Sequence, residues 1–218
     1  MNILAPSILS ADFTKLGEEI KSVVEGGAEY IHIDVMDGMF VPSISYGMPV
    51  IKSIRKVTDK VFDVHLMVTE PIRYIEDFKN SGADLITVHI EACKDLKATI
   101  EKIKSLGMKA SVALKPNTPI ESVFEYVPMI DMVLCMSVEP GFGGQKYIDS
   151  VTDKIKTLKK YIDDNGYKCD IEVDGGINFD NLEMVLEAGI NVVVAGSTVY
   201  SGDVVANTKK MCEIMHIN

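Results

Sequence analysis

The chain has 218 residues, 47% of them hydrophobic, and a formal net charge of −10 at pH 7. This length and apolar content suit one domain with a single large core, and we expect residues 1–218 to form it. The acidic balance excludes the broad basic surface of a nucleic-acid-binding protein, so any phosphate must be captured locally.

The first residues, MNILAPSILSADF, lack the positive region of a signal peptide, and Pro6 and Asp12 interrupt their apolar run. No later stretch reaches the ~18 uninterrupted apolar residues of a transmembrane helix. The irregular spacing of the cysteines, without a C-x-x-C pair, is typical of reduced thiols; they are Cys93, Cys135, Cys169 and Cys212. We therefore expect a soluble, cytoplasmic protein without membrane contact.

Eight short apolar runs, rich in β-branched residues, predict eight buried strands. They are 2–9, 30–36, 61–68, 84–91, 109–115, 131–138, 169–175 and 191–197. Segments with helical spacing lie between them, and three of these stop at glycine, namely 11–27, 70–82 and 150–166. Near-continuous apolar strands alternating with amphipathic helices indicate parallel strands covered by helices.

This alternation favours an α/β fold, a closed (β/α)₈ TIM barrel. The alternative is an open, doubly wound sheet, which tends to carry a glycine-rich turn after its first strand. The segment SILSADF, which follows the first predicted strand, contains no glycine. We therefore prefer the barrel.

Polar side chains lie at or near the ends of four predicted strands, at Ser7, His32, Asp34, His65 and Asp174. His32 and Asp34 are two positions apart in a strand, so both point to the same face. Sites in such barrels collect where the strands end, and two imidazoles with two carboxylates suit Zn²⁺, Fe²⁺, Mn²⁺ or Co²⁺. The candidate metal ligands are His32, Asp34, His65 and Asp174.

Other polar residues of the strands are expected to be structural. Asp63 shares a face with His65 and would either orient that ring or, as we prefer, satisfy backbone and lysine groups of the barrel interior. Glu172 lies deeper in its strand than Asp174, where a paired structural role is expected. His89 has no second metal-type residue two positions before it, and we predict an interior, hydrogen-bonded side chain.

Glycines gather in the three loops that follow the last three predicted strands. They let backbone N–H groups approach an anion closely, and these loops form the usual phosphate site of such barrels. Ser197 adds a hydroxyl. The candidate residues are Gly141, Phe142, Gly143, Gly144, Gly175, Gly176, Gly196 and Ser197.

Three methionines, Met36, Met67 and Met136, fall at or near strand ends. Methionine usually fills gaps in a core. Here the three would form a dry lining around the site, which would protect an anionic intermediate from bulk water.

The motifs APSILSADF, IHIDVMDGMFVP, DVHLMV, PGFGGQ, EVDGGIN and AGS follow in this order from residue 3 to about residue 200. Together they resemble the ribulose-phosphate 3-epimerase family. The resemblance implies a (β/α)₈ fold, homo-oligomers, and the interconversion of D-ribulose 5-phosphate and D-xylulose 5-phosphate in pentose-phosphate metabolism. It implies one divalent metal, with Zn²⁺ preferred, on the four candidate ligands.

The resemblance also implies that Asp34 and Asp174 are the two acid/base groups and that Ser7 and His65 contact the substrate. The glycine loops would surround the phosphate and the sugar chain. Inverting a carbon next to a ketone needs one acid or base group on each face of the substrate. Removal of the proton gives an enediolate, and a metal, acting as a Lewis acid, would stabilise it. No organic cofactor is needed because no electrons leave the substrate. Tyr46 lies where the chain departs from the family pattern, and no role is assigned to it.

Three alternatives remain open. A ketohexose 6-phosphate 3-epimerase, such as one acting on allulose 6-phosphate, has a similar pattern. A sugar-phosphate-binding barrel without catalysis is a second, and a lyase or decarboxylase is a third. Such lyases generally use a lysine at a strand end, and the only candidate, Lys115, is expected to be a solvated or loop-anchoring charge.

Overall fold

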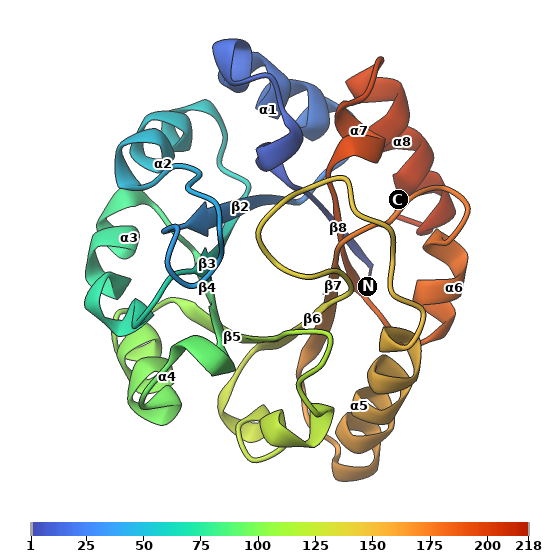
Figure 1. Ribbon diagram of the computed structural model, residues 1–218. Helices are drawn as coiled ribbons and strands as arrows, with labels where there is room; N and C mark the ends of the chain where they lie inside the picture. Colours follow the sequence, from blue (N-terminus) through green and yellow to red (C-terminus); the bar gives the residue numbers. More distant parts are fainter. Residues whose placement is uncertain (1, 218) are drawn as a thin grey trace.

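The computed structural model describes residues 2–217, and over this range it contains one sheet of eight parallel strands surrounded by helices (Figure 1). The strands are β1 (Ile3–Pro6), β2 (Tyr30–Met36), β3 (Val61–Met67), β4 (Leu85–His89), β5 (Lys109–Leu114), β6 (Met132–Met136), β7 (Asp170–Asp174) and β8 (Val192–Ala195). They pair in the order β1-β8-β7-β6-β5-β4-β3-β2, and a bridge between Ser7 and His32 joins β1 to β2. The predicted (β/α)₈ TIM barrel is confirmed.

The helices form the outer layer. They are α1 (Leu16–Glu25), α2 (Met48–Ile54), α3 (Ile75–Ser81), α4 (Leu96–Ser105), α5 (Val151–Asn165), α6 (Leu182–Glu187), α7 (Ser197–Tyr200) and α8 (Val204–Ile214). Between β5 and β6 two short 3₁₀ turns, Ile120–Val123 and Val127–Met129, replace a full α-helix. No helix among residues 2–217 is long and apolar enough to cross a membrane.

Glycine stops the helices where the sequence predicts. Gly82 and Gly166 follow α3 and α5 with φ of 107° and 66°, a left-handed conformation in which a side chain would be strained. The starts of α1 and α3 were predicted too early. α1 begins only at Leu16 because Asp12 caps a separate 3₁₀ turn, Phe13–Lys15, by accepting a hydrogen bond from the Thr14 amide.

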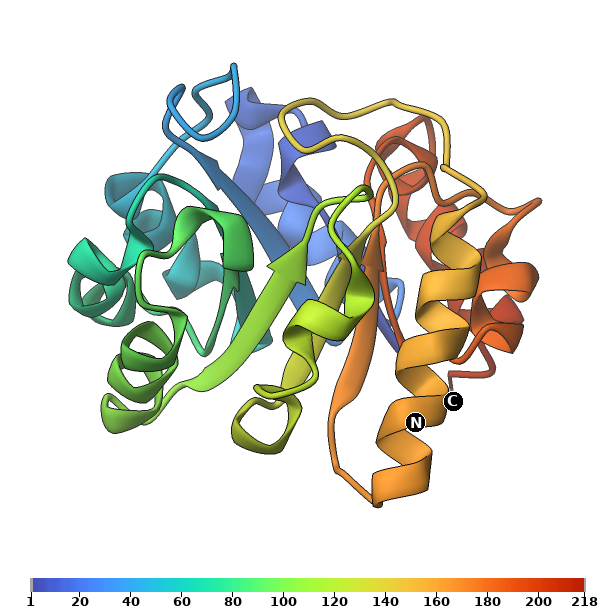
Figure 2. The same ribbon diagram turned by 60° about the horizontal axis from the view of Figure 1, so that its bottom comes forward.

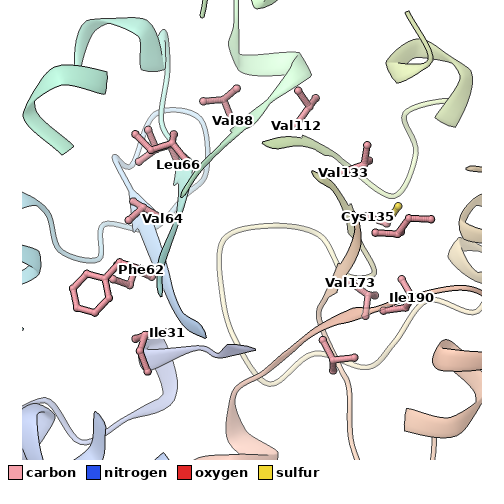
Figure 3. Packing of buried hydrophobic residues seen from close by; sticks show 14 of the residues in the cluster. Ile31, Phe62, Val64, Leu66, Val88, Val112, Val133, Cys135, Val173 and Ile190 are labelled. Carbon is pink, nitrogen blue, oxygen red and sulfur yellow. The ribbon is translucent and has the colours of Figure 1, made fainter. Parts of the chain in front are cut away.

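The strands alternate between two faces, and the outer face carries the main core. Ile31, Val64, Val133 and Val173 are fully buried and point from the strands toward the helices (Figure 3). All seven residues of β2 are buried, so its inward face, which carries His32, is polar yet removed from water. The alternation therefore places the polar side chains inside the barrel.

The loops after the strands converge at one end of the barrel. The segment 137–150, between β6 and α5, arches over this end near the loop that follows β2 (Figure 2). β1 is shorter than predicted because Ser7 caps a 3₁₀ turn, Ile8–Ser10, which turns the chain away from the strand direction. All four cysteines are free, with Cys135 and Cys212 buried and Cys93 and Cys169 partly exposed.

Candidate active site

Four predicted side chains meet inside the barrel, near the ends of β2, β3 and β7. His65 Nδ1 lies 2.9 Å from Asp34 Oδ1, and His32 Nε2 lies 3.3 Å from the same oxygen. Asp174 Oδ2 is 3.9 Å from His32 Nε2 and 3.9 Å from His65 Nδ1. Asp34 and Asp174 come from different sides of the ring, since β8 and β1 lie between β7 and β2.

This cluster fits a divalent cation. One ligand atom from each of the four residues lies within 4.8 Å of all the others. Ligands placed ~2.0–2.1 Å from a tetrahedral Zn²⁺ would be about 3.3 Å apart, close to the spacings seen here. His32 Nε2 is buried and has no hydrogen-bond partner among the described residues. A metal could therefore bind this nitrogen once His32 has lost a proton.

The two carboxylates of the cluster differ in their affinity for protons. Burial alone would lower the pKa of His32, but Asp34 and Asp63 outweigh it and hold that pKa well above its usual value. Burial pushes the pKa of Asp34 upward, yet His32 and His65 hold it well below the usual range. Burial, followed by the charge of Asp34, raises the pKa of Asp174 to about 6. Such a separation is typical of paired acid and base groups.

Behind His32 lies a second acidic group. Asp63 Oδ2 accepts a hydrogen bond from His32 Nδ1 at 2.6 Å. Our preference for backbone and lysine partners, and the alternative of orienting His65, were therefore both wrong. The reason is the register, in which His32 lies opposite Asp63 and Asp34 opposite His65. Glu172 Oε1 is 3.6 Å from His32 Nδ1, and neither Glu172 oxygen has a hydrogen-bond partner among residues 2–217. Burial, then the charge of Asp63, raises the pKa of Glu172 well above its usual value. The position of Glu172 beside His32 agrees with the expected paired role.

Behind His65 lies His89. The two Nε2 atoms are 2.9 Å apart, and His89 Nδ1 is 3.2 Å from Glu91 Oε2. Burial lowers the pKa of His89 to about 4, in spite of Glu91, so this imidazole is neutral. His89 is buried and hydrogen-bonded, as predicted. Glu91 was not predicted as a partner of His89, although it stands two positions after it, where the alternation of a strand would have indicated a shared face.

Two serines brace Asp34. Ser7 Oγ donates a hydrogen bond to Asp34 Oδ2 at 2.6 Å. Ser45 Oγ donates to the backbone oxygen of Asp34 at 2.7 Å and accepts from the Met36 amide at 3.0 Å. Ser45 was missed because it lies in a loop, where no strand alternation marks it. The hydroxyl of Tyr46 is buried without a hydrogen-bond partner among the described residues, and no contact assigns it a role.

A cavity of about 180 Å³ opens above the cluster. It brings together most of the predicted site residues, and those that line it are Ser7, Asp34, Met36, Met67, Met136, Gly141, Phe142, Gly143, Gly144, Asp174, Gly175, Gly176, Gly196 and Ser197. His32 and His65 do not line it, because both are completely buried below. Lining residues that the sequence analysis did not single out are Leu9, Ser10, Val138, Pro140, Gln145, Ile177, Asn178, Val194 and Thr198.

The glycine loops form one side of this cavity. Gly176 has φ of 68°, and a Cβ there would lie 2.3 Å from the Tyr147 amide nitrogen, so only glycine fits. Neither Gly144 nor Gly176 donates a backbone hydrogen bond within residues 2–217. Gln145 holds the first loop by donating to the backbone oxygens of Glu139 and Phe142. The loops therefore offer unused N–H donors to an anion.

Comparison with known proteins gives a consistent result. The model of the Ribulose-phosphate 3 epimerase family matches residues 3–200. The ribulose-phosphate 3-epimerase of Bacillus subtilis (strain 168) is 54% identical over 198 residues, which is 90% of this chain and 91% of that protein. The ribulose-phosphate 3-epimerase of Synechocystis sp. is 51% identical over 201 residues, covering 91% of this chain and 87% of that protein.

Solved structures with lower identity share the fold. The crystal structure of KGPDC from Streptococcus mutans superposes with a TM-score of 0.72 at 14% identity, covering 99% of this chain and 98% of that chain. A structure of 3-hexulose-6-phosphate synthase has a TM-score of 0.68 at 20% identity, covering 98% of this chain and 99% of that chain. These likenesses concern the barrel alone.

Proposed function

The chain belongs to the ribulose-phosphate 3-epimerase family, and from this premise we propose that it inverts C3 of D-ribulose 5-phosphate to give D-xylulose 5-phosphate, and the reverse. It is an isomerase. One observation carries the proposed mechanism. The carboxylates of Asp34 and Asp174, from separate strands, both lie near the buried imidazole of His32 at the floor of a cavity.

In this proposal Asp34 and Asp174 are the two acid/base groups: one removes the C3 proton and the other returns a proton to the opposite face. Removing that proton leaves negative charge on the neighbouring oxygens, and inversion requires that a proton return to the opposite face. One carboxylate accepts the proton while the other donates, and the roles exchange in the reverse direction. The hydrogen bond from Ser7 to Asp34 Oδ2 would orient the first carboxylate.

We propose a divalent metal, with Zn²⁺ preferred over Fe²⁺, Mn²⁺ or Co²⁺, held by His32, Asp34, His65 and Asp174. When bound, such an ion supplies a Lewis acid for the negative charge that develops on the substrate oxygens. The unpartnered Nε2 of His32 supports this assignment. No organic cofactor is required.

The remaining lining residues would bind and shield the substrate. The free amides of Gly144 and Gly176 support a phosphate position beside the glycine loops, with the Ser197 hydroxyl nearby. Met36, Met67 and Met136 line the cavity and would keep water from the reacting carbon. The partner is thus a small sugar phosphate.

Asp174→Asn tests the proposal. The amide cannot accept the proton, so we expect turnover to fall by about 10²–10⁴-fold, measured with ribulose 5-phosphate and, in parallel, allulose 6-phosphate. Residual exchange of the C3 proton with deuterated solvent is expected for one epimer only, the one whose proton faces Asp34.

The matched control is Asp170→Asn, at the other end of the same strand, where Asp170 Oδ1 accepts a hydrogen bond from Asn191 Nδ2 at 2.6 Å. This variant should retain near-wild-type turnover. Near-normal turnover in Asp174→Asn would contradict the assigned role, and faster turnover of allulose 6-phosphate would contradict the assigned substrate.

A further inference from the structure

The wall of the cavity above the cluster offers a phosphate no positively charged side chain. Among the described residues no lysine, arginine or histidine lines it, and its two ionisable groups, Asp34 and Asp174, are acidic. A phosphate beside the glycine loops must therefore be held by backbone N–H groups and by side-chain hydroxyls. Each hydroxyl that is free to donate then matters for binding.

Four side-chain hydroxyls line the cavity, and two of them already have acceptors. Ser7 Oγ donates to Asp34 Oδ2 at 2.6 Å, and Thr198 Oγ1 donates to a backbone oxygen at 2.8 Å. The hydroxyls of Ser10 and Ser197 donate no hydrogen bond within residues 2–217. Ser197 is already a candidate phosphate contact, which leaves the hydroxyl of Ser10 without a role.

Ser10 lies against the glycine loops. Strand β1 pairs with β8, so the turn that follows β1, Ile8–Ser10, is a neighbour of the loop that follows β8. A Cβ built on Gly196 would lie 2.5 Å from Ser10 Oγ, and one built on Gly143 would lie 3.8 Å from the same atom. The hydroxyl is therefore close to the loops after β6 and β8, and the missing side chain at Gly196 gives it room.

The turn after β1 fixes the position of Ser10. Ser7 Oγ accepts a hydrogen bond from the Leu9 amide at 3.4 Å, and the Ser10 amide donates to the Ser7 backbone oxygen at 3.2 Å. Ile8 is fully buried in the main core and anchors the turn. Since Ser7 also contacts Asp34, one short turn joins an acid/base carboxylate to the side of the cavity where the glycines lie.

We propose that Ser10 is a phosphate-binding residue, whose Oγ donates a hydrogen bond to a phosphate oxygen of the substrate. The proposal rests on the function proposed above. It adds a fourth loop, the one after β1, to the three glycine loops. A hydrogen bond to a charged acceptor is stronger than one between neutral groups, so the loss of this contact is measurable.

Ser10→Ala tests the contact. Alanine keeps the Cβ, and Ser10 enters the hydrogen bonds of the turn only through its backbone, so the turn is preserved. We expect the dissociation constant of inorganic phosphate, measured by ³¹P NMR titration, and KM for ribulose 5-phosphate each to rise by about tenfold. The value of kcat should change much less, because the phosphate contact is the same in the bound substrate and in the transition state.

Ser22→Ala is the matched control. Ser22 is half-buried, like Ser10, but it lies on α1 outside the cavity, where its hydroxyl donates to the Glu18 backbone oxygen at 3.1 Å. This variant should retain the phosphate affinity and the KM of the wild type. Equal phosphate affinities of Ser10→Ala and Ser22→Ala would overturn the proposal.

The two measurements identify which part of the substrate Ser10 contacts. A raised KM in Ser10→Ala with unchanged phosphate affinity would place the hydroxyl on the sugar chain and contradict the phosphate contact. Absence of phosphate binding by the wild type would overturn it as well. If the wild type bound phosphate but did not epimerise ribulose 5-phosphate, the proposed function would be wrong, and the phosphate titrations of the two variants would still decide the role of Ser10.

Discussion

The two ends of the barrel differ in what their charged groups contact. At the end where the strands begin, a hollow of about 530 Å³ is lined by lysines and aspartates, and it is larger than the cavity of about 180 Å³ above the histidines. Its carboxylates have ordinary partners. Asp131 accepts from the Ala110 amide at 2.9 Å, and Asp163 pairs with Lys159 at 2.5 Å.

At the end where the strands finish, charged groups are crowded together and incompletely satisfied. His32 Nε2 and both oxygens of Glu172 lack hydrogen-bond partners within residues 2–217, although all are buried. Leaving buried polar atoms unpaired costs stability, so their persistence indicates a ligand or a reaction. The size of a hollow therefore does not locate the site; the crowding of buried imidazoles and carboxylates does.

The largest effect is expected from Asp34→Asn. This change removes the charge that contacts Ser7, His32 and His65, and we expect turnover to fall by about 10²–10⁴-fold. Asp131→Asn, at the other end of the barrel, should lower thermal stability but leave turnover close to the wild-type value. Equal turnover in Asp34→Asn and Asp131→Asn would contradict the assignment of the active site to the end where the strands finish.

The pH dependence of metal binding comes next. His32 has a raised pKa and must lose a proton on binding at neutral pH, and Asp174 must lose a second below about pH 6, where its carboxyl is protonated. Affinity should therefore fall as the pH falls, by about tenfold per unit above pH 6 and about a hundredfold per unit below it. Calorimetric titrations between pH 5 and 7 measure this, and a flat profile would argue against these ligands.

Substitutions at two glycines with nearly the same backbone conformation distinguish an effect on substrate binding from an effect on stability. Gly176 and Gly166 have φ of 68° and 66°, but a Cβ at Gly176 would collide with the backbone at Tyr147, whereas a Cβ at Gly166 meets nothing within 4 Å. Gly166→Ala should cost about 1 kcal/mol of unfolding free energy and leave KM unchanged.

Gly176→Ala should instead displace the loop 137–150 and raise KM by about tenfold or more, which corresponds to losing one phosphate contact of about 1.5 kcal/mol. Steady-state kinetics and denaturant unfolding of both variants provide the comparison. An unchanged KM in Gly176→Ala would show that this loop does not bind the substrate.

The smallest effect is expected from Lys160→Ala on α5. Lys160 and Asp164 form an ion pair of 2.6 Å one helical turn apart, with both side chains largely exposed. Solvent screens such pairs, so the loss should be about 0.3–0.5 kcal/mol of unfolding free energy, with unchanged kinetics. A larger loss would indicate a role for this helix surface beyond solvation.

The barrel and most of the site could be predicted from local patterns. Alternation along β2 placed His32 and Asp34 on one face, and the tendency of sites to gather where strands end brought His65 and Asp174 to the same place. Glycines in three successive loops indicated the other side of the cavity. These inferences need only residues that are close in the sequence, or residues whose strands end at the same edge of the sheet.

Contacts between strands could not be predicted in the same way. The partner of Asp63 is His32 because of the register between β2 and β3, and the contact between His65 and His89 depends on how far two side chains reach across β3 and β4.

The sequence by itself thus determined the fold class and the side chains that face the barrel interior, because both follow from the period of apolar residues along single strands. Only the tertiary structure decided which of these side chains meet and which nitrogen of each imidazole faces the cluster. The physical reason is that hydrogen-bond partners are chosen by distances of a few tenths of an ångström, which the packing of all eight strands sets together.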